Sequence, residues 1–169
     1  MFKILGSLLI VIGAGGFGIG KAVRFYRQIR QLNELLRSLE LLKCEMNYTL
    51  LPVKELCKLT AERVGGTAGS LLNHYADYLS EDYTRAKAIQ AAMEKTSSLC
   101  IPNDVQMALL ELFGNLGRYD LDGENRLLVM TQKRLKATLE QCETEKKPLA
   151  KGYAALGICT GIALAILLV

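Results

Sequence analysis

The stretch Phe25–Leu50, FYRQIRQLNELLRSLELLKCEMNYTL, decides the fold class of this chain. Its apolar residues recur mostly at intervals of three and four, which places them on one face of an amphipathic helix. Nothing interrupts this pattern before Leu51. The sequence therefore predicts one continuous helix from about residue 4 to about residue 50, with a length of about 70 Å.

The segment before this stretch, residues 4–20, reads ILGSLLIVIGAGGFGIG and carries no charge between Lys3 and Lys21. As a helix it reaches about 26 Å, slightly short of a bilayer core of ~30 Å, and the two lysines can snorkel to the headgroups. Glycine weakens a helix in water. In the hydrocarbon core of a bilayer the segment is still expected to be helical, because backbone N–H and C=O groups without a hydrogen-bond partner are costly in lipid. We predict a transmembrane helix that packs against another span through small residues, namely Ala14 with Gly18 and Gly16 with Gly20.

The last residues, 152–169, read GYAALGICTGIALAILLV and form a second uncharged run after Lys151. As a helix this run reaches about 27 Å, so it also qualifies as a span. Basic residues follow the first run and precede the second: Lys21, Arg24, Arg27, Arg30, Lys146, Lys147 and Lys151. The positive-inside rule therefore places the middle of the chain in the cytoplasm and both termini outside.

Three regions follow from these runs. They are an N-terminal transmembrane helix (1–22), a cytoplasmic helical-bundle domain (23–147) and a C-terminal transmembrane helix (148–169). A cleaved signal peptide is the alternative for the first run, and it would make the chain an exported helical binding module. The basic residues directly after the run disfavour its translocation.

The middle of the chain has helical periodicity and no alternation typical of strands. Pro52 opens a second helix that runs to about Val64, and Gly65-Gly66 ends it. Further helices are expected around Leu71–Tyr78, after Ser80 as an N-cap with Ala86, Ile89 and Met93 buried, over Val105–Leu116, and from about residue 121 to Cys142. The predicted fold class is all-α: a small antiparallel helical bundle flanked by N- and C-terminal transmembrane helices.

The net charge of +4 combines an acidic middle of the chain with basic residues beside the two apolar runs. Residues 31–145 contain 13 Lys or Arg and 17 Asp or Glu, a balance of −4, whereas the other eight basic residues flank the apolar runs. This placement favours membrane headgroups over a nucleic acid as the partner of the basic residues. The five cysteines form no CxxC pair, so neither a disulfide scaffold nor a zinc site is predicted.

Two features resemble parts of enzymes. Gly13–Gly18 fits the GxGxxG pattern of dinucleotide-binding proteins, which makes a membrane-bound nucleotide-dependent enzyme the alternative function. That pattern requires a parallel sheet, with an acidic residue about 20 positions on, but the sequence predicts a helix there. The single histidine, His74, has no second catalytic group that the sequence places beside it. We predict no catalytic residue, no metal site and no cofactor.

The most informative local stretch is Asn115–Glu124, NLGRYDLDGE, which interrupts two amphipathic helices. Gly117 allows a positive φ at the end of one helix, and Asp120 or Asp122 can accept hydrogen bonds from the free N–H groups of the next. The stretch therefore predicts a helical hairpin. Its candidate partner-binding residues are Leu116, Gly117, Arg118, Asp120, Gly123 and Glu124. The alternative is that these residues only shape the turn.

Over its whole length the chain resembles the stage III sporulation protein AB family of endospore-forming bacteria. The resemblance rests on the glycine-rich first run, the basic helix after it, Leu51-Pro52, Leu116-Gly117 with Asp120, and the apolar C-terminal run. The middle is also similar to the cytoplasmic domain of the type II secretion platform protein, whose hairpin has a Leu-Gly…Asp…Gln pattern. Glu124 stands here where that pattern has Gln.

The resemblance implies a non-catalytic scaffold in a secretion-like channel complex of the mother-cell membrane that faces the forespore. Its implied partners are a cytoplasmic ATPase and the other membrane subunits of the channel, in addition to membrane lipids. A homo-oligomer is possible, and no nucleic acid is expected. Acidic surface in the middle of the chain could meet a basic partner.

Overall fold

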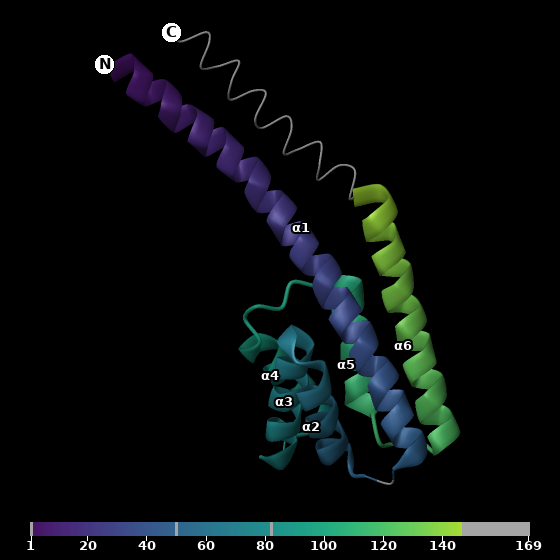
Figure 1. Cartoon of the computed structure of the whole chain (residues 1–169). Helices are drawn as coiled ribbons and strands as arrows, with labels where there is room; N and C mark the ends of the chain where they lie inside the picture. Colours follow the sequence, from purple (N-terminus) through teal and green to yellow (C-terminus); the bar gives the residue numbers. More distant parts are fainter. Residues whose placement is uncertain (1, 50, 82, 147–169) are drawn as a thin grey trace. The chain divides into compact units, whose positions relative to one another are not determined.

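The computed structural model of the chain describes the backbone of residues 2–49, 51–81 and 83–146, and their side chains except at 2–19, 21, 22, 145 and 146. The helices are α1 (Phe2–Tyr48), α2 (Val53–Val64), α3 (Gly66–Ser80), α4 (Arg85–Lys95), α5 (Asn103–Asn115) and α6 (Leu121–Gln141), followed by a π-helical turn at Cys142–Lys146 (Figure 1). The described residues contain no strand. The predicted all-α class and the long first helix are therefore confirmed.

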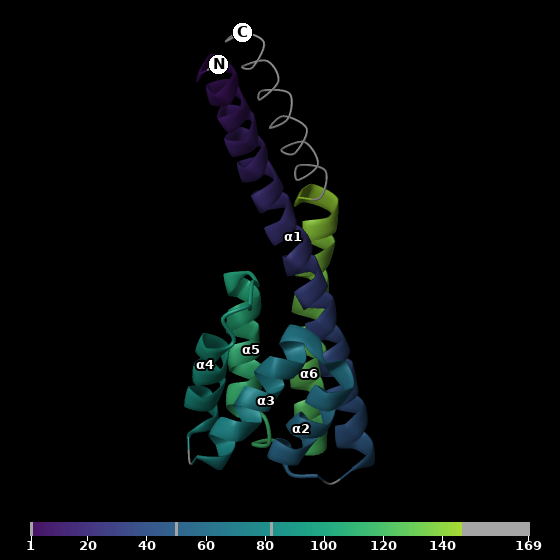
Figure 2. The same ribbon diagram turned by 60° about the vertical axis from the view of Figure 1, so that its left-hand side comes forward.

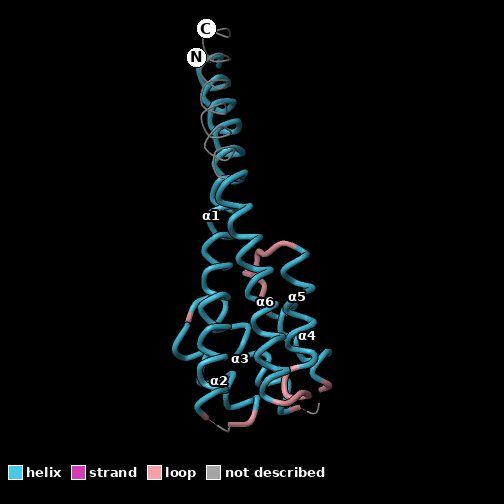
Figure 3. Tube along the Cα trace, turned by 90° about the vertical axis from the view of Figure 1, so that its right-hand side faces the viewer, coloured by secondary structure: helices cyan, strands magenta, loops and turns pink. Residues whose placement is uncertain are grey.

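Contacts divide the chain into two compact units, one of which is Arg30–Leu139, and the described residues on either side of it belong to the other. The boundaries fall inside α1 and α6. Within Arg30–Leu139, α2 packs on α3, α3 on α4 and α4 on α5, beside the end of α1 and most of α6 (Figure 2). Short loops join these helices, as the trace in Figure 3 shows. This unit is the helical bundle that the sequence predicted.

The end of α1 contributes a continuous stripe to the core of the bundle. Leu32, Leu35, Leu39 and Leu42 recur at intervals of three and four and are each no more than 2% exposed. The apolar periodicity of this part of the sequence therefore reports a buried face, as predicted. The stripe packs in a core that also contains Leu71, Leu72, Tyr75, Val105, Leu109, Leu112, Leu128 and Leu135.

A buried amide connects α1 to the loop between α4 and α5. The side-chain nitrogen of Gln31 donates to the Thr67 hydroxyl at 3.2 Å and to the Ser98 carbonyl at 2.7 Å. Its oxygen accepts from the backbone N–H of Cys100 at 2.6 Å. Because an unsatisfied amide is costly in a core, these bonds hold the loop in one position against α1.

The connection between α2 and α3 consists of glycine. Pro52 precedes α2, and Gly65 and Gly66 adopt φ of +63° and +61°. L-residues with a side chain rarely adopt this conformation, so the two glycines let α2 end and α3 begin within two residues. The predicted second helix and its ends are confirmed.

The prediction for the start of α4 is wrong. Ser80 is the last residue of α3, and its hydroxyl donates to the Ala76 carbonyl at 3.0 Å instead of capping the next helix. α4 begins at Arg85. Its buried residues are Ala88, Ile89 and Ala92, whereas Ala86 is exposed and Met93 half-buried. Two of the three buried residues are alanines, and their small side chains allow α4 to approach its neighbours closely. The predicted buried face, with Met93 in it, did not indicate this close approach.

Gly69 lies where α3 approaches the backbone of α2. A Cβ atom at this position would lie 2.7 Å from the carbonyl oxygen of Ala61, which cannot turn away as a side chain can. We expect Gly69→Ala to lower the free energy of unfolding by about 2 kcal/mol in urea unfolding followed by circular dichroism. Gly114→Ala is the control, because its Cβ would lie 3.8 Å from Ala86. Equal stability of the two variants would contradict this account of the helix crossing.

The transmembrane spans stay predictions. Among the residues whose side chains are described, no helix combines the length and the apolar character needed to cross a membrane. The side chains of Ala14, Gly16 and Gly18, and the whole run 152–169, lie outside the described residues. Of the predicted packing residues only Gly20 is described, and it is exposed with open space beside it.

Candidate functional site

The predicted hairpin joins α5 to α6. α5 ends at Asn115, Leu116 is fully buried, and Gly117 adopts φ +79°. A Cβ atom on Gly117 would also lie 2.8 Å from a methyl group of Val53 at the start of α2. Glycine is therefore required here both by the backbone conformation and by the closeness of α2. The predicted turn at Gly117 is confirmed.

Glu124 holds the hairpin from inside. Its Oε1 atom accepts hydrogen bonds from the backbone N–H groups of Gly117 at 2.7 Å, Arg118 at 3.0 Å and Tyr119 at 3.1 Å. The residue is only 4% exposed. Successive N–H groups that converge on one carboxylate form an anion-binding nest, here filled by the chain's own side chain. Glu124 thus fixes the loop by bonds to its backbone.

Asp120 caps the start of α6. Its carboxylate accepts a hydrogen bond from the N–H of Gly123 at 3.1 Å, the geometry of an N-cap. Of the two aspartates that the sequence offered as caps, Asp120 therefore takes this role. A carboxylate at this end of α6 also complements the helix dipole.

The candidate residues divide into an inner and an outer group. Leu116 and Glu124 are buried, Gly123 is half-buried, and Gly117, Arg118 and Asp120 are exposed. The outer group is accessible to a partner, whereas the inner group shapes the turn.

Sequence reasoning missed four exposed apolar or aromatic residues at the same end of the bundle: Tyr48, Leu51, Tyr119 and Leu121. Both connections, α1 to α2 and α5 to α6, lie at this end in Figures 1 and 2.

A cavity of about 240 Å3 lies between these two connections. Its walls are mainly apolar and include Met46, Leu51, Val53, Leu116 and Leu121, together with Glu124. Leu51 and Leu121 are about half exposed, at 42% and 50%, so the cavity reaches the surface between them. Two segments that are distant in sequence therefore form one hollow at the hairpin.

A second cavity, of about 540 Å3, carries two arginines at the other side of the hairpin. Arg85, at the start of α4, and Arg118 line it together with Gly114 and Tyr83. The Arg85 guanidinium also comes close to Gly117, at 3.3 Å from the position of a Cβ atom there. The hairpin thus separates a basic hollow from an apolar one.

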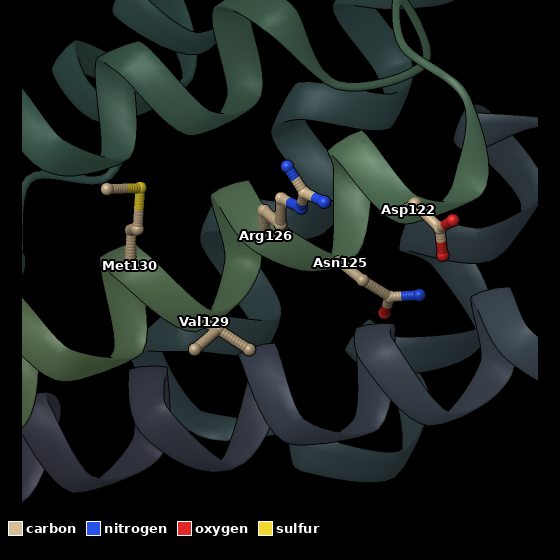
Figure 4. A pocket seen from close by; sticks show the side chains of 5 residues that line it. All are labelled: Asp122, Asn125, Arg126, Val129 and Met130. Carbon is tan, nitrogen blue, oxygen red and sulfur yellow. The ribbon is translucent and has the colours of Figure 1, made fainter.

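A third hollow, of about 530 Å3, runs along α6 (Figure 4). Arg126 and Met130 project on one side of the helix, and Asn125 and Val129 on the other. Asn125 exchanges two amide hydrogen bonds with Asn47 of α1, at 3.1 and 3.0 Å. The five labelled side chains therefore do not converge on one point.

In the part of the chain that the structure describes, the enzyme-like features of the sequence are not brought together into one site. His74 Nδ1 lies 3.1 Å from the Thr96 hydroxyl, which itself donates to the Ala92 carbonyl. No three His, Cys, Asp or Glu side chains of the described part could hold a metal ion together. Gly13–Gly18 lies within the continuous helix α1, which lacks the strand-to-helix turn that dinucleotide binding requires.

Two titratable groups are buried beneath the hairpin. Tyr75 packs edge-to-face on Phe113 with ring centroids 5.1 Å apart, and its hydroxyl donates to the Phe113 carbonyl at 2.7 Å. Burial raises the pKa of the Tyr75 hydroxyl well above its ordinary value. Burial also raises the pKa of the Cys57 thiol from 9.0 to about 12. Both groups therefore stay neutral in the folded chain at neutral pH.

These raised pKa values predict a loss of stability in alkali. Below about pH 9 both states keep the Cys57 proton, whereas above it the unfolded chain releases a proton that the folded chain retains. Stability should therefore fall as the pH rises toward 12, with about 1.4 kcal/mol per pH unit from Cys57. Urea unfolding of the parent chain and of Cys57→Ala between about pH 8 and 10.5 tests this. Identical pH dependence of the two would refute it.

The family model of stage III sporulation protein AB matches residues 3–169 of the chain. The chain belongs to the stage III sporulation protein AB family. The resemblance stated from the sequence is thereby confirmed, and membership in this family supports a role in sporulation.

A solved structure of a stage III sporulation protein AB has the same fold as this chain. The TM-score is 0.64 at 18% sequence identity, over 72% of this chain and 98% of that chain. At this identity the likeness shows the fold alone. No curated protein sequence matches the chain.

Proposed function

We propose that the chain is a non-catalytic platform component of the inner membrane in a sporulation channel complex between mother cell and forespore. Its helical bundle lies in the mother-cell cytoplasm and docks an ATPase, and its two spans contact other membrane subunits. Family membership supports the sporulation role, and the resemblance to the type II secretion platform protein motivates the partners.

The observation that carries the docking function is the exposed apolar surface at the hairpin. Tyr119 and Leu121 are 57% and 50% exposed, and Leu51 lies on the wall of the same cavity as Leu121. Exposed apolar and aromatic side chains that lie together mark protein contact sites more often than scattered ones do. The rigid loop beneath them, fixed by Glu124, suits a surface that must be preorganised for binding.

The membrane part of the proposal rests on charge. Arg24, Arg27 and Arg30 of α1 are exposed and recur every three residues after the apolar run. This spacing places them near one face of the helix, where anionic headgroups on the cytoplasmic side would attract them.

A photo-crosslinker at the hairpin tests the docking function. With p-benzoylphenylalanine in place of Tyr119 in sporulating cells, we expect a light-dependent adduct between the full chain and a cytoplasmic ATPase, identified by mass spectrometry. The same replacement at Met107 is the matched control, because Met107 is also exposed but lies more than two helical turns before the hairpin.

The two positions make the result decisive. An ATPase adduct from position 119 and none from position 107 supports docking at the hairpin. Equal adducts from both positions, or an adduct from position 107 alone, would contradict the assignment of the hairpin as the contact surface. Absence of any ATPase adduct at position 119 would contradict the docking function itself.

A further inference from the structure

The basic cavity beside the hairpin holds two positive charges without an ion-pair partner in the described part of the chain. Arg85 lines it from the start of α4, and Arg118 lines it from the hairpin. The Arg85 guanidinium lies beside Gly117, with Nη2 3.3 Å from the position of a Cβ atom there. Arg118 Nη1 donates only a long hydrogen bond of 3.4 Å, to Asn115 Oδ1. Among the described residues, neither arginine lies within ion-pair distance of a carboxylate.

The wall of the basic cavity is accessible from the surface. Exposed residues make up much of it, namely Tyr83, Thr84, Ala86 and Arg118. Pockets for small molecules instead enclose most of the surface of their ligand. A wall of this kind suits a side chain that projects from the surface of a partner protein, and Arg118 can meet such a side chain without any rearrangement of the core.

The chemistry of the wall selects an anion with an apolar stem. Guanidinium groups bind carboxylates and phosphates through parallel N–H···O bonds. The first turn of α4 adds to the preference, because Thr84 precedes the helix without a side-chain cap bond and the N-terminus of a helix favours negative charge. Leu79, Tyr83 and Ala86 supply apolar contacts in the same wall.

The position of the basic cavity favours a protein over a membrane as the source of this anion. The helix rises by about 1.5 Å per residue, so Arg30 and Met46 of α1 lie about 24 Å apart along its axis. Met46 lines the apolar cavity together with Gly117, and the Arg85 guanidinium lies on the other side of Gly117. Headgroups at Arg30 would therefore be well beyond the screening length of about 8 Å at physiological ionic strength.

We propose that the basic cavity receives an acidic side chain of the docked partner protein, with its carboxylate paired to the guanidinium groups of Arg85 and Arg118. Residues 31–145 have a charge balance of −4, so the bundle as a whole repels an acidic partner segment. A local attraction within this repelling surface fixes the point of contact and the orientation of the partner. The proposal rests on the docking function above, because the cavity borders the same hairpin.

The site is tested first without any partner protein, in the detergent-solubilised full chain. The probe is N-acetylglutamate α-amide, which has one side-chain carboxylate, and N-acetylglutamine α-amide is its uncharged counterpart. In a chain with 15N-labelled arginine, the side-chain Nε–H signals report binding at about pH 6, where the carboxylate is ionised. The signals of Arg85 and Arg118 are assigned from their loss in Arg85→Lys and Arg118→Lys.

At constant ionic strength, we expect a saturable shift of the Arg85 and Arg118 signals with the glutamate probe and no shift with the glutamine probe. The signal of Arg134, which pairs with Glu111 at 3.0 Å, should not move. No saturable shift, or an equal shift with the glutamine probe, would overturn the site. A shift with inorganic phosphate but none with the glutamate probe would assign the cavity to a phosphate group and overturn the proposed carboxylate.

Variants connect the response to the two guanidinium groups. Arg85→Gln and Arg118→Gln should each weaken binding of the glutamate probe by about fivefold or more, measured on the remaining arginine signal. Arg126→Gln is the matched control, since it removes an exposed arginine outside the basic cavity, and it should bind like the parent. Ala86→Tyr adds bulk at an exposed position of the wall and should abolish both shifts while both charges remain. Unchanged binding in Arg85→Gln and Arg118→Gln would contradict the proposal.

The crosslink from position 119 separates this site from the docking function itself. In sporulating cells, Arg85→Glu should remove the ATPase adduct, because it places a negative charge where the partner's carboxylate binds, whereas Arg126→Glu should retain it. An adduct that survives Arg85→Glu would refute the carboxylate site and leave docking at the hairpin intact. Binding of the glutamate probe, with no adduct from position 119 in the parent chain, would keep the site and refute the ATPase as its partner.

Discussion

Replacing Glu124 by alanine is expected to lower the free energy of unfolding by about 3 kcal/mol. The change removes the one acceptor shared by the N–H groups of Gly117, Arg118 and Tyr119. It also leaves a void beside Leu116 in the wall of the cavity. Because the three N–H groups belong to a loop near solvent, water can replace part of the lost bonding. Urea unfolding of the detergent-solubilised chain, followed by circular dichroism, measures the effect.

Two further variants separate the hydrogen bonds from the charge. Glu124→Gln retains an oxygen acceptor, so it should cost about 1 kcal/mol and leave the hairpin formed. Asp122→Ala changes an exposed residue of the same turn and should change stability by less than about 0.5 kcal/mol. If Glu124→Ala were no less stable than Asp122→Ala, Glu124 would not be the group that holds the hairpin.

The other large effect is expected at Phe113. This residue is 1% exposed, its ring packs on Tyr75, and its carbonyl accepts the Tyr75 hydroxyl at 2.7 Å. Phe113→Ala removes the ring contact and leaves a cavity where α5 meets α3, so we expect a loss of about 4 kcal/mol. The denaturation midpoint should fall accordingly, and the near-ultraviolet signal of the tyrosines should change with it.

Tyr75→Phe is the matched variant for this contact. It keeps the ring and removes only the hydroxyl, so the Phe113 carbonyl loses one donor and the expected loss is about 1 kcal/mol. A loss of more than about 3 kcal/mol in Tyr75→Phe would mean that the hydrogen bond, and not the ring packing, dominates at this site. A loss below about 1 kcal/mol in Phe113→Ala would contradict the assigned core.

The parts of the fold that could be predicted are those with local signals. The spacing of Leu32, Leu36 and Leu39 reports a helix face whatever packs against it. Gly65-Gly66 and Gly117 break helices because positive φ is accessible to glycine. Asp120 could be read as a cap for the same reason, since an N-cap depends on the next three residues alone.

The start of α4 could not be predicted from local signals. Ser80 has the right side chain for an N-cap, but its hydroxyl bonds within the last turn of α3. Thr84 then precedes α4 without a side-chain cap bond. The choice between two polar residues therefore depends on where tertiary packing ends α3, which a single sequence does not contain.

The hairpin was found from the sequence, but the roles of its residues were not. Glu124 was a candidate contact residue, yet it is buried and bonds to the loop from inside. The cavity was also invisible, because Leu51 and Leu121 meet only through the packing of two connections that are distant in sequence. Tyr119 and Leu121 could have been noticed as apolar residues in a turn of otherwise polar character.

The central claim is a membrane-anchored platform whose bundle lies in the cytoplasm, and topology tests it most directly. Single cysteines would be placed at Ser80, which is exposed at the end of α3, and at Val169, after replacement of Cys44, Cys57, Cys100, Cys142 and Cys159. A membrane-impermeant maleimide is then applied, before and after lysis, to protoplasts of vegetative cells that express the chain, in which the outer face of the membrane is open to the medium. The account predicts labelling at position 169 in intact protoplasts, and labelling at position 80 only after lysis. Labelling at position 80 in intact protoplasts would place the bundle outside the cytoplasm and contradict ATPase docking.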